Sequence, residues 1–524
     1  MRTLTFFGRN IYSTRVVFIG RLAGIILNVR AQSPFAANTG PFAGELTMTI
    51  GGRPVAASGT LPVFNPATRE VIAHAPAATE AQLNDAVDAA REAFRSWGRS
   101  SQAARRDALN CVGAMLQENA ACFARLLTLE QGKPRSAAEA EISGSVRWCH
   151  EIAKQTLHDE MMEDGADRQV VTHFSPLGVV GAIVPWNFPV SLAIWKIAPA
   201  LRTGNCIVVK PSPYTPMCLL RLAELCRDRL PPGVFSVVTG GDEIGKLMTA
   251  HPGIDKIAFT GNTDTGKHVM RSAAGTLKRL TLELGGNDPA IVLPDVDAKA
   301  IAPRLFWAAF RNNAQFCNAT KRLYVHEHLY DDVLRELVAY TRTVKVGDGA
   351  NPDSQLGPLQ NEPQYRKVIE YIEDCVRNGY KFAAGGKVDG GARGWFLPVT
   401  LVDNPPDDSR VVKEEPFGPI LPVLKWREED EVVARANDSQ LGLGASVWGQ
   451  DVSAVKRIGE RLDAGTIWLN EVHEYSPHQA FGGHKQSGIG CENSLHGLME
   501  YTNTTTVTWK KTASFGRASG DRGP

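Results

Sequence analysis

The chain has 524 residues, 43% of them hydrophobic, which is enough for a large core and too many for one ordinary domain, so two or three domains are expected. Its 57 basic and 56 acidic residues nearly cancel, which argues against nucleic acid or an acidic membrane surface as the main partner. The nine cysteines are scattered, without a CxxC motif or a Cys/His cluster, so we expect reduced thiols, a cytoplasmic location and no metal site.

The first 47 residues differ in composition from the rest of the chain. They are rich in arginine, and their first acidic residue is Glu45. An arginine-rich, acid-poor segment is typical of a mitochondrial transit peptide, which would place the protein in the mitochondrial matrix. The alternative is a non-native extension before Met48. The apolar run at 16–29 is interrupted by Arg21 and is too short to span a bilayer, so no membrane partner is expected.

Residues 48–78 are β-rich, and a long amphipathic helix follows them. Thr79 and Gln82 have the spacing of a capping box at its start. Apolar residues at helical spacing mark the face that we expect to be buried: Leu83, Val87, Ala90, Phe94 and Trp97. Further helix is expected over 101–157, with an interruption at Gly132-Lys133-Pro134.

The segment 159–176 is acidic and then strand-like, and it predicts a projecting hairpin. Between 177 and 284, apolar Val/Ile runs alternate with Gly, Pro, Ser or Thr and then with helical segments. This pattern predicts buried parallel strands with crossover helices, as in a dinucleotide-type open sheet. A second α/β unit is expected from about 285 to 470, with strands at “PAIVLP”, “KRLYVHE”, “ILPVLKW”, “GASVWG” and “GTIWLN”. Two such units in tandem predict a ligand cleft between them.

Three residues are candidates for catalysis. Cys317 lies in an Asn/Gln-rich turn before a strand. A polar, exposed position in such a turn would lower the pKa of the thiol and suit a nucleophile. Spacing alone favours the alternative, an ordinary core cysteine. Glu283 ends an apolar strand before two glycines, which suits a general base or an ordinary loop-edge glutamate. Asn187 follows a buried strand, where its amide could donate to an oxyanion or satisfy its own turn.

Two glycine-containing turns are candidate phosphate sites. “VVTGGDEIG” and “FTGNTDTG” each follow an apolar strand and enter a helix, whose N-terminus attracts phosphate. The glycines that would allow close approach of the backbone are Gly240, Gly245, Gly261 and Gly266. Neither turn fits GxGxxG, so each signal is weak alone. Lys210, followed by Ser212, ends the intervening strand and could reach a ribose or a phosphate.

The order of these motifs resembles the aldehyde dehydrogenase superfamily from Met48 to Val507. The motifs that carry the resemblance are “PWNFP”, “FTGNTDTG”, “LELGG”, the Gln315–Cys317 turn, “EEPFGP”, “ANDSQLGLGASVW” and “FGGHKQSGIG”. The separation between Glu283 and Cys317 also matches the family. Because the motifs are linked and cover most of the chain, the match is specific.

The resemblance implies an aldehyde-dehydrogenase-like α/β fold, with two open α/β-sheet domains and a small β hairpin for oligomerisation. The implied segments are 48–158 and 177–284 for the dinucleotide-binding domain, 285–480 for the catalytic domain, 159–176 and 498–510 for oligomerisation, and 511–524 for a flexible tail. A homodimer or a homotetramer is therefore expected.

The resemblance also implies oxidation of an aldehyde to the carboxylic acid by NAD(P)+. Cys317 would form a thiohemiacetal and then a thioester, which water activated by Glu283 would hydrolyse. Asn187 and the backbone N–H of Cys317 would hold the oxyanion. Lys196 matches a family lysine near the active site. The turns and the resemblance together give these cofactor-binding candidates: Trp186, Lys210, Ser212, Gly240, Gly245, Gly261, Asn262, Gly266, Glu415 and Phe417.

Several positions depart from the family pattern. Pro213 stands where a glutamate usually binds the adenosine ribose hydroxyls, and its loss removes a repulsion against a 2′-phosphate, so NADP is an alternative to the expected NAD. Ala314 replaces a usual glycine, which stiffens the catalytic turn. Asn262 replaces a usual serine, and Cys491 replaces a usual arginine without a physical account.

Arg311 is the most informative departure, because many family members have an aromatic residue there, in the aldehyde tunnel. Members that act on succinate semialdehyde have arginine at this position and a second arginine at the position of Trp195, which is missing here. Arg311 would bind a carboxylated or polar aldehyde, or form a salt bridge at the surface, and the second is slightly favoured. The other candidates for the substrate tunnel are Phe188, Trp195, Phe316 and Phe481.

Two other functions stay open. A CoA-acylating semialdehyde dehydrogenase of the same fold typically lacks the base at the position of Glu283, which argues against that activity here. A catalytically silent member with a structural or binding role would not need to retain Cys317, Glu283, Asn187 and Lys210.

Overall fold

The structure is a computed structural model that describes residues 44–388, 391 and 393–512. Most of the predicted N-terminal extension and of the predicted flexible tail lies outside these residues. None of the helices within them combines the length and the apolar character that a bilayer crossing requires.

Eight strands form the first sheet, in the order β2-β1-β9-β8-β7-β10-β11-β21. They are β1 (Met48–Ile50), β2 (Arg53–Val55), β7 (Val179–Ile183), β8 (Cys206–Lys210), β9 (Phe235–Val237), β10 (Lys256–Thr260), β11 (Arg279–Glu283) and β21 (Gly488–Ile489). The strands from β7 to β11 pair in parallel, which confirms the open sheet that the Val/Ile runs predicted. The strand order reverses between β7 and β10, where sheets of this type bind ligands.

Helices cover this sheet, and α1 to α4 match the predicted helix after Thr79 and the predicted helical segment 101–157 with its interruption at 132–134. They are α1 (Glu80–Trp97), α2 (Gln102–Glu118), α3 (Ala120–Gln131), α4 (Arg135–Lys154), α5 (Pro189–Thr203), α6 (Met217–Cys226), α7 (Asp242–Ala250) and α8 (Thr263–Ala273), followed by the short 3-10 helix η1 (Ala274–Thr276). The capping box of Thr79 and Gln82 is present. On the predicted face of α1, Phe94 is only half-buried, while the other four residues are buried.

Seven strands form the second sheet, in the order β14-β15-β16-β13-β12-β18-β19. They are β12 (Asp288–Val292), β13 (Thr320–His326), β14 (Lys381–Ala384), β15 (Thr400–Asp403), β16 (Ile420–Trp426), β18 (Gly444–Trp448) and β19 (Thr466–Leu469). All five predicted strands are present. The sequence reasoning missed β14 and β15, which extend the sheet beyond β16.

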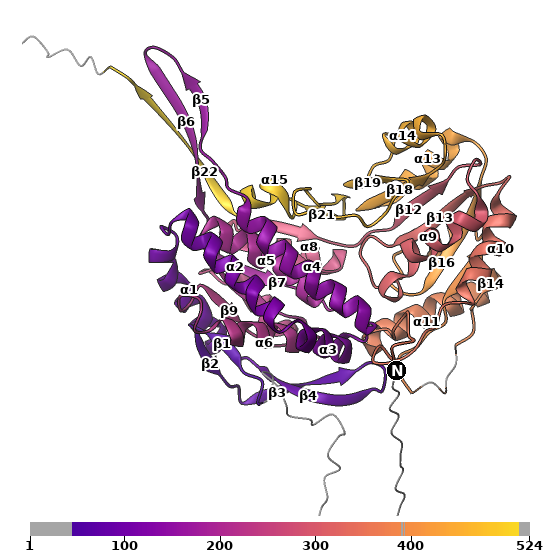
Figure 1. The fold of residues 1–524 in the computed structure, drawn as a ribbon, viewed down its shortest axis with the longest axis horizontal. Coiled ribbons are helices and arrows are strands. Elements are labelled where there is room, and N and C mark those ends of the chain that lie inside the picture. Colours follow the sequence, from indigo (N-terminus) through magenta and orange to yellow (C-terminus); the bar gives the residue numbers. More distant parts are fainter. Residues whose placement is uncertain (1–43, 389–390, 392, 513–524) are drawn as a thin grey trace, which may run out of the picture. The chain divides into compact units, whose positions relative to one another are not determined.

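Further helices cover the second sheet, and together with the remaining short elements they complete the two α/β units (Figure 1). The helices of the second unit are α9 (Ala298–Phe310), η2 (Arg311–Ala314), α10 (Tyr330–Thr341), α11 (Glu362–Arg377), α12 (Arg410–Lys413), α13 (Glu429–Asn437) and α14 (Val452–Gly459). α15 (Ser494–Met499) packs against α5 of the first unit. Two-stranded sheets pair β3 (Gly59–Asn65) with β4 (Glu70–Ala77), and β17 (Leu441–Gly442) with β20 (His484–Lys485).

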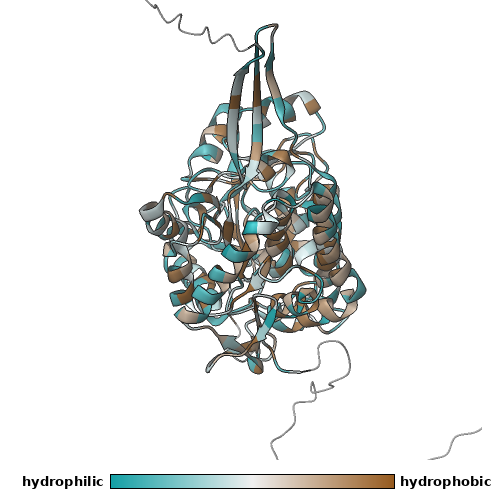
Figure 2. Cartoon of the chain, turned by 90° about the vertical axis from the view of Figure 1, so that its left-hand side faces the viewer, coloured by the Kyte–Doolittle hydropathy of each residue, from teal (hydrophilic) through white to brown (hydrophobic). Residues whose placement is uncertain are grey.

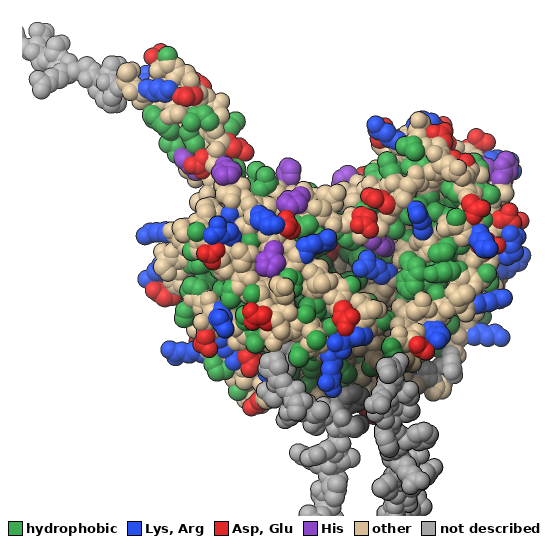
Figure 3. All heavy atoms as spheres, viewed as in Figure 1, with side chains coloured by type: hydrophobic (Ala, Val, Ile, Leu, Met, Phe, Trp, Pro, Cys, Tyr) green, Lys and Arg blue, Asp and Glu red, His purple; other side chains and the backbone are tan. Residues whose placement is uncertain are grey.

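A three-stranded sheet projects from the rest of the described chain, as Figures 1 and 2 show. It is built from β5 (Glu160–Asp164), β6 (Arg168–Pro176) and β22 (Thr502–Lys510), in the order β22-β6-β5. The hairpin predicted at 159–176 is therefore present. Figure 3 shows hydrophobic side chains on the surface of this sheet. Met162 on β5 and Trp509 on β22 are exposed.

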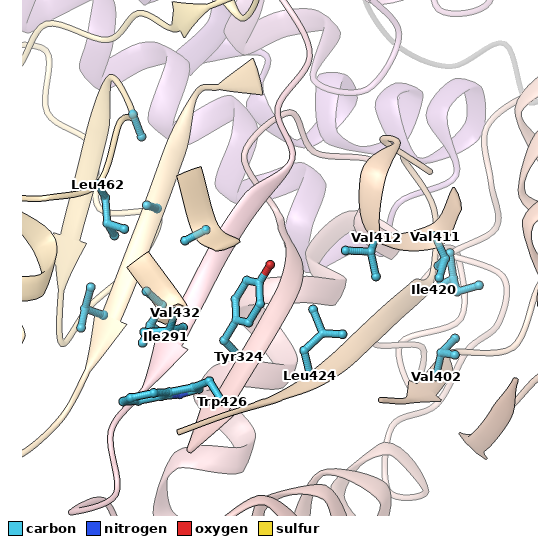
Figure 4. Packing of buried hydrophobic residues seen from close by; sticks show 14 of the residues in the cluster. Ile291, Tyr324, Val402, Val411, Val412, Ile420, Leu424, Trp426, Val432 and Leu462 are labelled. Atoms are coloured by element: carbon cyan, nitrogen blue, oxygen red, sulfur yellow. The ribbon is translucent and has the colours of Figure 1, made fainter. Parts of the chain in front are cut away.

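The second sheet is held by a hydrophobic cluster between its strands and the helices that cover it (Figure 4). Tyr324, Leu424 and Trp426 lie in its centre and are at most 5% exposed. The indole N–H of Trp426 donates to the carbonyl of Val292 at 3.2 Å, so this polar group is satisfied inside the core. Burial of the side chains on the central strands therefore fixes the second sheet.

Replacement of Leu424 by alanine is expected to destabilise the protein by about 2–5 kcal/mol, because a large-to-small change at a fully buried site leaves a cavity. Urea denaturation followed by tryptophan fluorescence measures this loss. The matched control is Val452→Ala, at a side chain that is 68% exposed, which should change the stability by less than about 0.5 kcal/mol. Equal stability of the two variants would contradict the central place of Leu424 in the core.

Candidate active site

A cleft of about 1250 Å³ lies between the two sheets, where sequence reasoning expected a ligand site. The first sheet contributes residues at the carboxyl ends of its strands, and the second contributes residues just before the amino ends of its strands. The lining includes these predicted site residues: Trp186, Asn187, Gly261, Asn262, Glu283, Cys317, Glu415 and Phe417. The fold thus brings together residues that are far apart in the sequence.

The turn before Cys317 has an uncommon backbone. Asn312, Asn313 and Ala314 all lie in the left-handed region, with φ of 52°, 58° and 59°. Asparagine tolerates this region, but for an alanine it costs about 1–2 kcal/mol. Ala314 therefore stands where a glycine would fit without strain, and other contacts must hold the turn.

Side-chain amides supply these contacts. Gln315 Nε2 donates to the carbonyl of Pro358 at 3.2 Å, and Gln315 Oε1 accepts from the backbone N–H of Gln360 at 2.8 Å. Asn313 Nδ2 donates to the carbonyl of Gly357 at 3.0 Å. The Asn/Gln-rich sequence of the turn therefore binds it to the neighbouring loop.

The electrostatic setting of Cys317 differs from the prediction. Its side chain is half-buried, and burial and the Glu283 carboxylate raise the thiol pKa well above its usual range. The expected lowering of the pKa is therefore wrong, and the thiol is the resting form at neutral pH. Lys321 opposes the rise: its ammonium donates to the carbonyls of Phe316 and Cys317 and lies 3.1 Å from Glu415 Oε1.

Glu283 ends β11 as a buried carboxylate. Among the described residues, neither of its oxygens has a hydrogen-bond partner. Burial raises the pKa of Glu283 to about 7, and the charge of Lys196 opposes this rise. A carboxyl group that titrates near neutral pH and has free acceptor oxygens is suited to take a proton from a water molecule in the cleft.

A buried ion pair lies beside Glu283. Lys196 Nζ is 2.8 Å from Glu492 Oε1, and it donates to Thr260 Oγ1 at 2.8 Å. Thr260 is the partner of Glu283 in the register of β10 and β11. Lys196 therefore places a positive charge next to the carboxylate and limits the rise of its pKa, whereas the negative charge of Glu492 adds to that rise.

Asn187 follows β7 and extends its amide to the turn before Cys317. Asn187 Nδ2 donates to the carbonyl of Gln315 at 3.1 Å. A carboxamide nitrogen carries two N–H groups, so one remains for an oxyanion on a molecule bound at Cys317. The geometry thus supplies a thiol, a carboxylate and an amide donor in one cleft.

A model of the aldehyde dehydrogenase family matches residues 55–507. The chain belongs to the aldehyde dehydrogenase family. A probable aldehyde dehydrogenase from a Pseudomonas species is 42% identical over 466 residues, which cover 88% of this chain and 94% of that protein. Phenylacetaldehyde dehydrogenase from Pseudomonas fluorescens is 37% identical over 476 residues, which cover 88% and 95%. The solved NAD+ complex of an aldehyde dehydrogenase from Bacillus cereus is 36% identical and matches with a TM-score of 0.87, covering 90% of this chain and 98% of that chain.

The N-terminus of α8 opens on the cleft. Gly261, Asn262 and Thr263 line the cleft at this point. Asn262 Oδ1 accepts from the backbone N–H of Thr265 at 2.8 Å and caps the helix. Because asparagine and serine are comparable N-caps, the change from the usual serine keeps the cap. The partial positive charge of this helix end suits a phosphate.

Three further cofactor-binding candidates lie together in the cleft. Phe417 meets Trp186 edge to face, with 5.5 Å between ring centroids. Glu415 accepts from the backbone N–H of Gly286 at 3.2 Å. Gly285 makes this approach feasible, because a Cβ there would come within 2.3 Å of Glu415 Oε2.

The remaining cofactor-binding candidates stay predictions, because the lining of the cleft, as the described residues form it, does not include them: Lys210, Ser212, Gly240, Gly245 and Gly266. Lys210 is buried, which lowers its pKa to about 8, and Gly245 packs beside its side chain. Gly266 has a packing role, since a Cβ there would lie 2.5 Å from Leu284 Cδ2.

The predicted aromatic residues of the substrate tunnel form one cluster. Trp195 and Phe481 have ring centroids 5.5 Å apart, and Phe188 and Phe316 are 5.0 Å apart. Tyr475, which sequence reasoning missed, joins the two pairs, with centroids 5.7 Å from Phe481 and 6.4 Å from Phe316. Since Phe316 precedes Cys317, this aromatic wall lies next to the candidate nucleophile.

Arg311 is exposed, and no carboxylate of the described chain forms an ion pair with it. The surface salt bridge that the sequence slightly favoured is not formed among the described residues. Its guanidinium lies 5.8 Å from the centre of the Phe316 ring. It also lines a separate cavity of about 420 Å³ together with Arg304, Trp307 and His473.

Sequence reasoning missed several charged residues of this region: Lys133, Glu141, Lys321 and Glu492. Lys321 follows the candidate nucleophile closely in “CNATKR”, and Lys133 stands in a break between two helices, so both left a weak signal. Glu141 and Glu492 left none, because each pairs with a lysine whose position only the fold determines.

Removal of two neighbouring charges should move the pKa of Cys317 in opposite directions. Glu283→Gln should lower it, because a negative charge is lost, and Lys321→Met should raise it, because a positive charge is lost. The rate of alkylation by iodoacetamide against pH, followed by mass spectrometry on the Cys317 peptide, reports the thiolate. Cys317→Ala identifies the background, and two shifts of the same sign would contradict this electrostatic account.

Proposed function

We propose that this chain oxidises an aldehyde to the carboxylic acid with NAD(P)+, with Cys317 as nucleophile, Glu283 as general base and Asn187 as oxyanion donor. The observation that carries the proposal is the buried Glu283 carboxylate, which has a pKa of about 7, no hydrogen-bond partner among the described residues, and a place in the same cleft as the thiol and the amide. Together these groups supply what acyl transfer from an aldehyde requires.

In the first half of the reaction, the Cys317 thiol releases its proton to solvent in the cleft, and its sulfur bonds to the carbonyl carbon of the aldehyde. Asn187 Nδ2 and the backbone N–H of Cys317 hold the oxyanion that forms, and each such donor contributes about 3 kcal/mol. A bound nicotinamide supplies the acceptor for the hydride that leaves the same carbon. The product on Cys317 is a thioester.

In the second half, Glu283 removes a proton from water. The hydroxide adds to the thioester carbon, and the carbon–sulfur bond then breaks. The carboxylic acid leaves, and the Cys317 thiolate takes up the proton that Glu283 removed from water, which restores the thiol and the free carboxylate. The free oxygens of Glu283 and its near-neutral pKa suit it to this step.

The cleft fits a dinucleotide, and NAD is the cofactor that we propose. The N-terminus of α8 offers a phosphate site, and Glu415 lies where it could accept from ribose hydroxyls. The related enzyme from Bacillus cereus was solved with NAD+. NADP is the alternative, because Pro213 leaves no carboxylate at its position to repel a 2′-phosphate.

The walls next to Cys317 suggest the class of aldehyde. The aromatic cluster of Trp195, Tyr475 and Phe481 favours an apolar or aromatic body, and a related enzyme from Pseudomonas fluorescens is named for phenylacetaldehyde. Arg311 adds a positive charge without an ion pair among the described residues. We therefore infer that a carboxylated or polar aldehyde is a second class worth testing.

The projecting sheet supports assembly into a homodimer or homotetramer. One edge of β22 pairs with β6, and its other edge has no strand partner among the described residues. Exposed apolar side chains accompany it: Met161, Met162, Val507 and Trp509. An unpaired edge with apolar side chains favours association with a second copy.

The CoA-acylating activity is the second enzymatic candidate, since CoA could resolve the same thioester. Glu283 argues against it, because a thiol acceptor does not require a water-activating base. A silent binding protein has less support, since the three proposed catalytic groups lie together in one cleft.

Purified protein offered NAD or NADP with aliphatic, aromatic and carboxylated aldehydes, without CoA, should reduce the cofactor, and Cys317→Ala should abolish the turnover. Absorbance of the reduced nicotinamide measures the rate. Arg311→Ala serves as the matched control for the substrate, because it should weaken only the use of carboxylated aldehydes. Folded protein that binds cofactor but turns over only after addition of CoA would overturn the hydrolytic assignment.

The hydrolytic half of the reaction should depend on the ionisation of Glu283. Because its pKa is about 7, the base is ionised above that pH, and hydrolysis should slow by about tenfold per pH unit below it. Rapid-mixing experiments should then show a burst of reduced cofactor followed by a slow steady state. Glu283→Gln should retain the burst and lose the steady state at every pH. A wild-type steady-state rate that is flat across neutral pH would contradict the role of Glu283.

A further inference from the structure

A buried ion pair contacts the Asn187 segment from outside the lining of the cleft. Lys133 lies in the break between α3 and α4, and Glu141 lies on α4. Their side chains form an ion pair in which each is only 1% exposed. Neither residue belongs to the lining of the cleft, so the mechanism above does not use them.

Both charges bind the segment that carries Asn187. Lys133 Nζ donates to the carbonyl of Asn187 at 3.0 Å and lies 3.9 Å from the centre of the Phe188 ring. Glu141 Oε1 accepts from the backbone N–H groups of Val190 and Ser191, at 3.0 and 3.2 Å. One ion pair therefore binds the segment 187–191 at both of its ends.

Glu141 also supplies the hydrogen-bond acceptor that the N-terminus of α5 lacks. The N-cap residue of α5 is Phe188, whose side chain has no acceptor for the backbone N–H groups of the first turn. The Glu141 carboxylate takes over this function from another helix, and its negative charge suits the positive end of α5. The start of α5, and with it the position of Asn187, therefore depends on Glu141.

The carbonyl of Asn187 has a second donor, which comes from the turn before Cys317. Asn312 Nδ2 donates to it at 3.1 Å. Lys133 and Asn312 thus share one acceptor, the first from the helical layer of the first sheet and the second from the turn of the candidate nucleophile. This shared acceptor sets the position of the oxyanion donor relative to the thiol.

The geometry points to Lys133 and Glu141 as positioning residues for Asn187: the buried pair holds the amide of Asn187 at the distance from Cys317 that stabilises the oxyanion. Lys133 is not an acid in this account, because its ammonium is already occupied by Glu141, the Asn187 carbonyl and the Phe188 ring. The inference rests on the proposed function, since it assumes that Asn187 acts on an oxyanion.

The test uses a variant that leaves no unpaired buried charge. Lys133→Met alone would leave the buried Glu141 carboxylate without its ion-pair partner, so Lys133→Met is combined with Glu141→Gln. This double variant should lower kcat by about 10- to 100-fold, since a small displacement of an oxyanion donor has an effect of that size. The KM for the cofactor and the alkylation rate of Cys317 should stay within about twofold, because neither depends on the oxyanion.

A comparison in the Asn187→Ala background separates positioning from general support of the fold. If the pair acts through Asn187, the double variant should cost less than about threefold in that background, because coupled residues are non-additive. An equal loss of kcat with and without Asn187 would overturn the inference, and so would an unchanged kcat in the double variant. If Asn187→Ala itself keeps full activity, the proposed oxyanion role fails, which is a separate result.

Two further variants complete the design. Lys133→Gln with Glu141→Gln keeps an N–H donor toward the Asn187 carbonyl, so it should recover part of the rate that the methionine variant loses. Lys278→Met is the matched control: this lysine also donates to main-chain carbonyls, those of His251 and Ile254, but does not contact the segment 187–191, and it should leave kcat unchanged.

If the double variant does not fold, Asn312→Gly tests the same carbonyl from the turn before Cys317. Glycine accepts the left-handed backbone of position 312 and removes the amide that donates to Asn187. The same non-additivity with Asn187→Ala is expected. Additive losses would overturn the shared-acceptor arrangement in this variant as well.

Discussion

The short connection at 284–287 joins the last parallel strand of the first sheet directly to the first strand of the second. With so little chain available, the carboxyl edge of one sheet must face the amino edge of the other. Glu283 ends the first of these strands, and the turn of Cys317 precedes the neighbour of the second strand. Opposing edges of two sheets therefore supply the base and the thiol to one cleft, and the glycines in the connection leave room for the groups that approach it.

The region around the cleft contains more buried charge than a stable core needs. Lys196 with Glu492, Lys133 with Glu141, and Lys321 with Glu415 form ion pairs that are buried or nearly so. Burial of paired charges adds little to stability. Their shared feature is position: each pair contacts a group of the candidate active site, namely the strand neighbour of Glu283, the Asn187 segment or the Cys317 carbonyl. The cost of burying charge is thus concentrated where geometry and pKa matter for chemistry.

Much of this arrangement could be predicted from local sequence. Apolar runs followed by glycine-containing turns indicated the parallel strands, and the linked motifs indicated the family, the cleft and the groups at Cys317, Glu283 and Asn187. Long-range pairing could not be predicted, so the strands β14 and β15 and the partners Glu141 and Glu492 were missed. The pKa of Cys317 was predicted with the wrong sign, because burial and a neighbouring carboxylate depend on the fold and not on the turn. The lack of an ion pair between Arg311 and any other described residue was missed for the same reason.

Three glycines outside the lining of the cleft place a different demand on the sequence. A Cβ at Gly349 would lie 2.3 Å from the carbonyl oxygen of Lys133, and one at Gly357 would lie 2.2 Å from that of Gly132. Gly132 itself has a φ of 93° and would press a Cβ against two prolines. A saturation-mutagenesis map of this chain would therefore show a second intolerant region, set by backbone contact between two loops, alongside the intolerant positions of the cleft.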